Sequence, residues 1–261
     1  SKNFIYLSGT PFRALSTGEF LEEQIFSWTY SDEQSAKASW DPAKGKNPYA
    51  ALPEMVMMTY KVPDSISMGI TDEYDEFNLG EFFSVKDGRF AHQHEISTWL
   101  DLLHDSGYKN VSDPTMETPP LPFADDYLKN YLRHTMWFLP SIEACDCLEE
   151  MLKADKFFSK YKIVNCSGKH CGDGNAARIP VDEAMDGDAE DNQTITLSCG
   201  KLTTGVTIKP WTGIFMLRPL KSPETYFQAG FRVQSPWTAK DAEGNTRILK
   251  KSCYIFDFAP N

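Results

Sequence analysis

The strongest constraint on the fold is a regular alternation of short apolar runs with helix-like segments, which begins near residue 134. The apolar runs have the length of β-strands and cover residues 135–139, 161–166, 194–198, 214–217 and 253–258. Ser141 and Ser222 stand where helix N-caps are expected, and Ser222 is followed by Pro223 and Glu224 in the order typical of a first helical turn. Strands that alternate with helices at this spacing predict an α/β fold with a parallel sheet.

The first half of the chain is less regular. Residues 4–7 and 55–60 are apolar runs of strand length, and residues 95–106 carry apolar side chains at helical spacing. Residues 14–52 are polar and rich in turn-forming residues, so we expect an irregular extension there with one helix at residues 31–39. Residues 64–94 are acidic and aromatic without a clear period, which favours a loop or insertion.

Charge and composition restrict the partners and the cellular compartment of the protein only loosely. The 261 residues carry a net charge of −11, which disfavours a nucleic-acid partner. However, six acids and no base lie within residues 181–191, and without them the charge is −5. A solvated loop or helix end is the simplest explanation of this segment. No apolar stretch reaches the roughly 20 residues of a membrane span. The six cysteines suit reduced core thiols, so we expect a cytoplasmic protein without a membrane partner.

Two loops could carry chemistry. Residues 8–13, Ser-Gly-Thr-Pro-Phe-Arg, follow the first apolar run, and residues 200–207 follow the run at 194–198. The second loop combines two glycines, three threonines and Lys201, which together could contact a phosphate group. Ordinary strand-to-loop turns explain both loops equally simply. Neither is a P-loop, because the spacing Gly-x-x-x-x-Gly-Lys-Ser/Thr is absent from the sequence.

The helix expected after Ser222 supplies a third candidate. Gln228, Arg232 and Ser235 have the spacing that places three side chains on one helical face. If this face lies at the carboxyl edge of the sheet, Gln228 and Arg232 can reach a phosphate, and a guanidinium suits the charge that develops in phosphoryl transfer. Taken alone, this spacing is explained more simply by a solvent-exposed helical face.

Metal binding and nucleophilic catalysis are less well supported. The best ligand sets are Cys166 and Cys171 with His170, and His92 with His94. Neither has the paired Cys-x-x-Cys spacing of a structural zinc site, so we expect core or surface residues and no metal site. No Gly-x-Ser-x-Gly nucleophile motif is present.

Four segments follow one another in the order of motifs III, IV, V and VI of superfamily 2 helicases. They are residues 7–13 (Leu-Ser-Gly-Thr-Pro-Phe-Arg), 134–141 (His-Thr-Met-Trp-Phe-Leu-Pro-Ser), 203–210 (Thr-Thr-Gly-Val-Thr-Ile-Lys-Pro) and 228–235 (Gln-Ala-Gly-Phe-Arg-Val-Gln-Ser). The chain thus resembles the second RecA-like lobe of these DEAD/DEAH-type helicases. Phrases such as Tyr-Ser-Asp-Glu-Gln at 30–34 resemble most closely the helicase regions of restriction-type ATP-dependent proteins.

The resemblance implies a division of the chain into three parts. Residues 1–13 would end the first RecA-like lobe, residues 14–52 would form an extension or linker, and residues 53–261 would be the second lobe with insertions. The expected fold is a RecA-like parallel sheet flanked by helices. The Walker A loop and the acidic Asp-Glu-x-His/Asp box of such helicases are missing and would precede residue 1.

The resemblance also implies roles for individual residues. Arg232 and Gln228 would act on the nucleotide, and Gly205 and Thr207 would join Arg232 in contacting it. Coupling to nucleic acid would fall to Ser8, Thr10, Thr203 and Thr204. Two of the motifs depart from the family pattern. In motif VI, Phe231 replaces a glycine and Ser235 replaces the last arginine. In motif V, Thr207 replaces the usual aspartate. The γ-phosphate role is therefore assigned to Arg232 alone.

The resulting hypothesis is a fragment of an ATP-dependent helicase or DNA translocase of a restriction system. The full-length protein would use ATP and Mg²⁺, whereas this fragment alone would neither hydrolyse nor tightly bind ATP. DNA and the first RecA-like lobe are the expected partners, and RNA remains open. A competing hypothesis is a non-catalytic α/β interaction module with relic motifs, which would bind a protein through the aromatic-rich residues 14–90. A small-molecule α/β enzyme is disfavoured by the missing nucleotide fingerprint.

Overall fold

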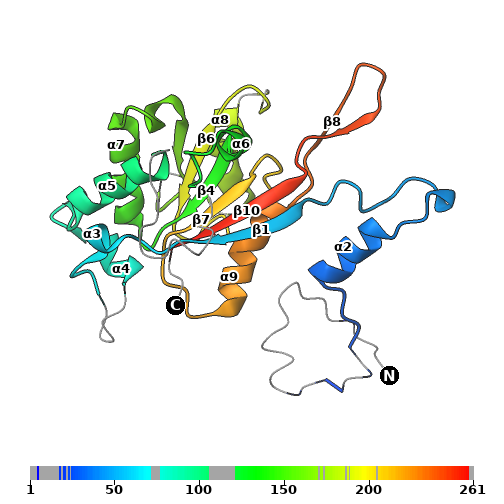
Figure 1. Cartoon of the computed structure of the whole chain (residues 1–261), viewed down its shortest axis with the longest axis horizontal. Helices are drawn as coiled ribbons and strands as arrows, with labels where there is room; N and C mark the ends of the chain where they lie inside the picture. The colour runs from blue at the N-terminus through cyan, green and yellow to red at the C-terminus, as the bar shows by residue number, and fades with distance from the viewer. Residues whose placement is uncertain are drawn as a thin grey trace, which may run out of the picture.

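A computed structural model places a six-stranded parallel sheet at the centre of the chain (Figure 1). It describes residues 25–258 except 72–76, 106–120, 170, 173, 186, 188 and 204, together with the single residues 5, 18, 20, 21 and 23. The strand order is β1-β10-β7-β4-β6-β5, and every neighbouring pair is parallel. The strands are β1 (Glu54–Thr59), β4 (His134–Phe138), β5 (Lys162–Asn165), β6 (Thr194–Ser198), β7 (Gly213–Met216) and β10 (Ser252–Asp257). The predicted parallel α/β sheet is confirmed.

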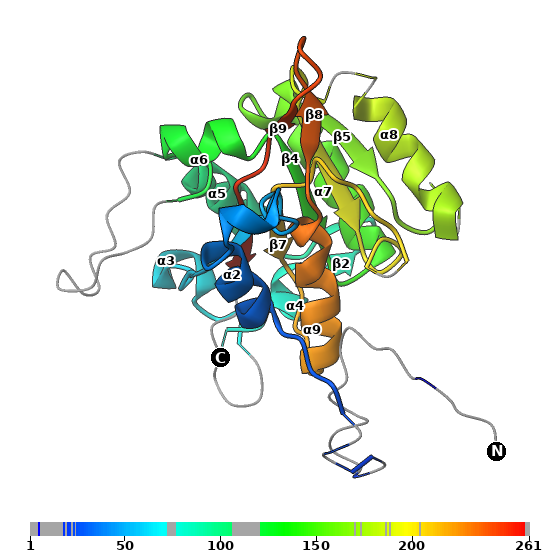
Figure 2. The same ribbon diagram turned by 90° about the vertical axis from the view of Figure 1, so that its right-hand side faces the viewer.

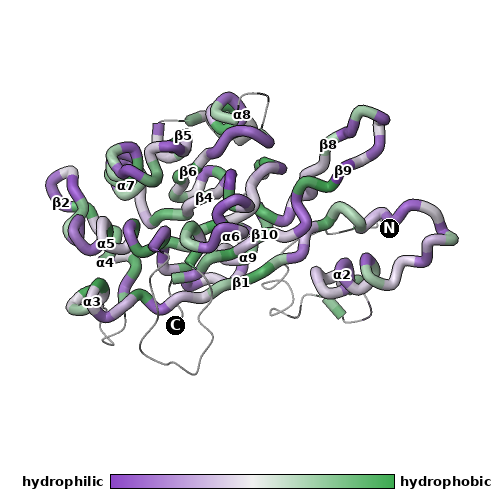
Figure 3. The backbone as a smooth tube through the Cα atoms, turned by 45° about the horizontal axis from the view of Figure 1, so that its top comes forward, coloured by the Kyte–Doolittle hydropathy of each residue, from purple (hydrophilic) through white to green (hydrophobic). Residues whose placement is uncertain are grey.

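Helices cover both faces of this sheet, so its central strands are buried on both sides. Trp137 and Phe215 point into one core, which α5 (Gln93–Leu103) and α7 (Ile142–Ala154) close. Met136 and Ile214 point into the other core, which α8 (Ile179–Met185) and α9 (Pro223–Gly230) close. Figure 2 shows the sheet between these helices, and Figure 3 shows hydrophobic residues along its strands, the edge strand β1 included.

The helix ends follow the capping residues that the sequence offers. The Ser141 side chain accepts a hydrogen bond from the backbone N–H of Ala144 at 3.0 Å. Ser222 accepts one from the backbone N–H of Thr225, with Pro223 in the first helical turn. Each hydroxyl satisfies a backbone donor that has no partner inside its helix, which explains why both helices begin where the sequence predicts.

The extension contains the expected helix, α2 (Tyr30–Ala38), which is capped by a reciprocal pair of hydrogen bonds between Thr29 and Asp32. It contacts the rest of the protein through the Tyr30 hydroxyl, which accepts a hydrogen bond from the backbone N–H of Met55 at 2.8 Å. In Figure 1 this arm and the β8–β9 hairpin project on the same side of the sheet. The hairpin pairs β8 (Thr238–Lys240) with β9 (Thr246–Ile248).

The sequence indicated a loop or insertion at residues 64–94, and the described residues of this range are not a loop. They fold into short elements, namely α3 (Asp64–Ser67), α4 (Leu79–Phe82), β2 (Val85–Lys86) and β3 (Arg89–Phe90). Leu79, Phe82 and Phe83 are fully buried, and Phe82 and Phe83 make edge-to-face contacts with Trp99 of α5. The interpretation failed because elements this short show no periodicity, whereas their aromatic side chains still complete a core.

The other described elements are short: α6 (Asp126–Tyr131) and the 3₁₀ turns η2 (Pro42–Lys44), η3 (Phe158–Lys160), η4 (Gly174–Arg178) and η5 (Phe231–Gln234). The acidic segment at 181–191 begins within helix α8 rather than in a loop alone. The predicted strand at 4–7 lies outside the described residues apart from Ile5.

Candidate functional site

The segments that resemble motifs V and VI lie in direct contact. The guanidinium of Arg232, in η5, donates one hydrogen bond from Nη1 to the carbonyl oxygen of Val206 at 2.9 Å. It donates another from Nε to the carbonyl oxygen of Gln228, one helical turn earlier, at 3.1 Å. Burial lowers the pKa of Arg232 below its ordinary value, but a guanidinium stays protonated at neutral pH. The charged arginine therefore joins the loop before β7 to the end of α9.

Arg232 does not lie at the carboxyl edge of the sheet, as the sequence interpretation assumed. Helix α9 begins after the carboxyl end of β7 and runs back along the sheet. Its end is fixed near the amino edge, because the Val233 carbonyl accepts a hydrogen bond from Lys250, two residues before β10 begins. The expectation failed because the sequence gives the start of a helix after a strand but not the place where its last turn comes to lie.

Lys250 connects separate backbone segments, a role that the sequence did not indicate. Its side chain is fully buried, and its ammonium donates three hydrogen bonds to the carbonyl oxygens of Lys209 (2.8 Å), Trp211 (2.7 Å) and Val233 (2.8 Å). Burial lowers its pKa to about 7, while three carbonyl acceptors match the three N–H bonds of the protonated form. Lys250 thus fastens the end of the segment that resembles motif V to the segment that resembles motif VI. In the sequence it is one lysine of a Lys-Lys pair before an apolar strand, and no signal distinguishes it.

The other predicted residues of motif V have different surroundings. The Thr203 hydroxyl is mostly buried and donates to the carbonyl oxygen of Gly200 at 2.6 Å, so it stabilises its own loop. Gly205 is exposed and has a φ of 70°, a backbone conformation that favours glycine, and Thr207 is exposed. Lys201 donates to the carbonyl oxygen of Cys171 at 3.0 Å, which ties the loop to the segment before η4.

Gln228 lies within hydrogen-bonding distance of its helical neighbour Glu224, with Nε2 3.3 Å from Oε1. Its side chain therefore lies along α9, one turn before Arg232. Ser8, Thr10 and Thr204 lie outside the described residues. The structure thus brings Arg232 together with the motif V loop and places Gln228 beside it on α9.

The strand that resembles motif IV carries a buried histidine. His134 is fully buried, with Nδ1 2.9 Å from the Thr194 hydroxyl and Nε2 2.7 Å from the carbonyl oxygen of Ala189. The carbonyl can only accept, so Nε2 carries the proton and Nδ1 accepts from the hydroxyl. Burial lowers the pKa of His134 to about 4, and the ring is neutral at pH 7. This bond network anchors β4 to β6 and has a structural role.

Neither ligand set that the sequence offered brings three ligands together among the described residues. His92 Nε2 lies 3.2 Å from the Glu81 carboxylate, whereas His94 is exposed. Cys166 and Cys171 are buried, all six cysteines are unpaired as disulfides, and His170 lies outside the described residues.

No protein-family model matches the chain. A Mycoplasma pneumoniae protein, provisionally assigned as the C-terminal part of a type II restriction enzyme and methyltransferase, is 28% identical over 282 aligned positions. The match covers 98% of this chain and 37% of that protein, so the chain spans little more than a third of its relative.

Solved structures give partial overlaps. The C-terminal part of the Fun30 ATPase domain overlaps 64% of this chain and 50% of that one, at 16% identity and a TM-score of 0.35. The ATP-dependent type ISP restriction-modification enzyme LlaBIII bound to DNA overlaps 79% of this chain and 12% of that one, at 17% identity and a TM-score of 0.40. No helix among the described residues is long and apolar enough to cross a membrane. With its helicase-like motif order on a parallel α/β sheet, the chain resembles the helicase regions of restriction-type proteins.

Proposed function

We propose that this chain is the second motor lobe, with insertions, of an ATP-dependent superfamily 2 helicase or DNA translocase of a restriction system. The observation that carries the proposal is the bond between Arg232 and the carbonyl of Val206. It joins two segments that a motor of this kind must move together, namely the one that contacts the nucleotide and the one that contacts the nucleic acid.

We assign the nucleotide contact to Arg232, although it does not lie at the carboxyl edge of the sheet, because its guanidinium has donors to spare. A guanidinium has five N–H bonds, of which Arg232 uses two toward Gln228 and Val206. The other N–H bonds can be offered to an anionic oxygen while the existing bonds fix the plane of the group. A preorganised cation of this kind stabilises charge on a transferring phosphoryl group. In the full-length protein, ATP and Mg²⁺ would bind between this lobe and the first one, with Arg232, Gln228, Gly205 and Thr207 on this side.

Coupling to DNA is assigned to the same loop and to the first residues of the chain. The exposed Thr207 can contact a phosphate, Thr203 holds the loop from within, and Ser8, Thr10 and Thr204 complete the set. Closure of the cleft between lobes around ATP, and its opening after hydrolysis, would move one lobe along the strand. DNA is preferred to RNA because the Mycoplasma relative is named a restriction enzyme and LlaBIII is seen bound to DNA. Action on DNA in turn fits a cytoplasmic protein.

The division into residues 1–13, 14–52 and 53–261 is part of the same proposal. The first range would close the first lobe, the second would be an extension carrying α2, and the third would be the motor lobe proper. Two hydrogen bonds would hold the extension against this lobe, from the Met55 backbone N–H to the Tyr30 hydroxyl (2.8 Å) and from Gln234 to Glu33 (3.4 Å).

A second candidate is a non-catalytic interaction module. One observation favours it, namely that Ser235 stands where motif VI has its last arginine, so that a motor would depend on Arg232 alone. Exposed aromatic side chains in the extension, with Phe26 at 87% and Trp28 at 49% exposure, would then bind a protein partner.

DNA-stimulated ATP hydrolysis separates the two candidates. We expect the full-length protein to hydrolyse ATP faster when duplex DNA is added, and the isolated chain to show no turnover under the same conditions. A full-length protein without ATP hydrolysis, with or without DNA, would refute the motor and favour the module. Robust turnover by the isolated chain would refute the assignment of the chain as half of an active site.

A further inference from the structure

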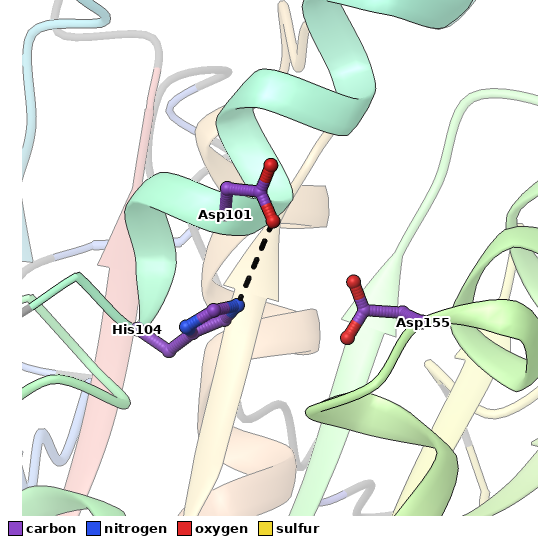
Figure 4. Close-up of side chains that lie close together, drawn as sticks. All are labelled: Asp101, His104 and Asp155. Carbon is purple, nitrogen blue, oxygen red and sulfur yellow. Dashed lines mark ion pairs between the residues drawn. The ribbon is translucent and has the colours of Figure 1, made fainter.

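A mixed cluster of two carboxylates and one imidazole lies away from the motifs, at the ends of two helices. Asp101 and His104 come from the last turn and the C-cap of α5, and Asp155 is the C-cap of α7. One potential ligand atom from each side chain lies within 4.8 Å of the other two. Figure 4 shows the three side chains directed toward a common point from these two elements.

The His104 ring is held in place, yet its Nε2 atom has no hydrogen-bond partner within the described part of the chain. The ring stacks on Phe157 with centroids 4.4 Å apart and planes inclined by 14°. Nε2 is buried, and its nearest carboxylate oxygen, on Asp101, is 3.9 Å away, which is too long for a hydrogen bond. A buried polar nitrogen without a partner is rare in native proteins and often indicates an ion or water that completes the site.

Asp155 is equally well oriented. Its Oδ1 atom accepts hydrogen bonds from the backbone N–H groups of Phe157 (2.7 Å) and Phe158 (2.8 Å). These bonds fix the carboxylate and leave Oδ2 available as a ligand. Such outer hydrogen bonds to a carboxylate are typical of metal sites.

Three further features favour a cation at this point. The C-termini of α5 and α7 converge here, and a helix C-terminus carries a partial negative charge of about half an elementary charge. In the described part of the chain, no lysine or arginine forms an ion pair with Asp101 or Asp155. Asp101 and His104 also line an open recess between α5 and α3, which gives an ion access from solvent.

We propose that Asp101, His104 and Asp155 bind a divalent transition-metal ion of the zinc class. Imidazole nitrogen and carboxylate oxygen are both zinc ligands, and three protein ligands leave a fourth position for water, whereas Mg²⁺ and Ca²⁺ prefer oxygen ligands alone. Zinc ligands lie about 2.0–2.2 Å from the ion, so the donor atoms must close to about 3.5 Å from one another. The exposed side chain of Asp101, at 71% exposure, can make this movement without disturbing the core.

The test is titration of the purified chain with ZnCl₂ by isothermal calorimetry, in the presence of a reductant that keeps the six cysteines reduced. We expect one site with a Kd below about 10 μM, a free energy of roughly 7 kcal/mol. His104→Ala and Asp155→Asn should each weaken binding at least about tenfold. Asp155→Asn retains an Oδ1 acceptor for Phe157 and Phe158, so the fold should persist, which circular dichroism checks.

The matched control is His94→Ala, because His94 lies on the same helix, is exposed and is remote from the cluster. It should bind zinc as the wild type does. Absence of a one-to-one site in the wild type would overturn the proposal. So would unchanged affinity in both His104→Ala and Asp155→Asn, because the zinc would then be bound elsewhere on the chain.

Discussion

Protonation of His134 should weaken the protein in mild acid. The ring is fully buried between Thr194 and Ala189, and this burial disfavours its charged form. Its pKa is about 4 in the folded protein, against an ordinary value of 6.5. The unfolded chain therefore takes up a proton near pH 6.5, whereas the folded chain resists protonation until about pH 4.

The magnitude follows from this difference. Each pH unit between the two pKa values costs about 1.4 kcal/mol, so the full difference corresponds to about 3 kcal/mol of stability. Because the pKa is lowered by folding, this stability is fully present above pH 6.5 and is lost as the pH falls from 6.5 toward 4. This is a large share of the 5–15 kcal/mol that typically stabilises a domain.

The assay is urea unfolding at half-unit steps from pH 7.5 to 4.5, for the wild type and His134→Gln. Glutamine can still donate a hydrogen bond to the Ala189 carbonyl but does not titrate. The variant should be less stable at pH 7.5, and its deficit should shrink by about 2.5 kcal/mol by about pH 4.5. A difference between the two proteins that stays constant across this range would refute the argument, because acids elsewhere contribute equally to both.

Two further substitutions test the contacts that hold the motifs and the sheet. Lys250→Met should lower the free energy of urea unfolding by about 3 kcal/mol or more. Three carbonyl oxygens lose their donor, and an unsatisfied buried group costs about 1–3 kcal/mol. A loss below about 1 kcal/mol would contradict the role of Lys250 in joining these segments. Ser141→Ala should cost about 1 kcal/mol by removing the N-cap of α7. Ser141→Asp should retain most of that stability, and equal losses in both variants would show that the cap is not the cause.

The sequence predicted the regular half of the fold well, for physical reasons. Strands that are buried on both faces appear in the sequence as continuous apolar runs. Ser141 and Ser222 indicate the starts of helices because an N-cap forms its hydrogen bond within a few residues. The short elements at residues 64–94 were missed because their stability comes from aromatic contacts made only in the folded chain. The segments that resemble helicase motifs could be located in the sequence, but the course of α9 places Arg232 away from the expected carboxyl edge of the sheet.

Residues whose role depends on distant partners gave no signal in the sequence. Lys250 acquires its role from three carbonyls in two other segments, and no local pattern marks a lysine for burial. The cluster at the end of α5 was equally hidden, since Asp101 and His104 meet Asp155 only when α5 and α7 pack on the same face of the sheet. Ligand spacings along the chain pointed instead to His92 and His94, which do not converge.

The most direct test of the account is the rate of DNA-stimulated ATP hydrolysis by the full-length protein carrying Arg232→Ala. Arg247→Ala is the matched control, because Arg247 pairs with Glu190 on the surface in the β8–β9 hairpin. Loss of an arginine that stabilises phosphoryl transfer costs about 10³-fold or more, so we expect near-complete loss of turnover in Arg232→Ala and a normal rate in Arg247→Ala. Arg232→Ala with a near-normal rate and an intact fold would contradict the assignment of this chain as the second motor lobe.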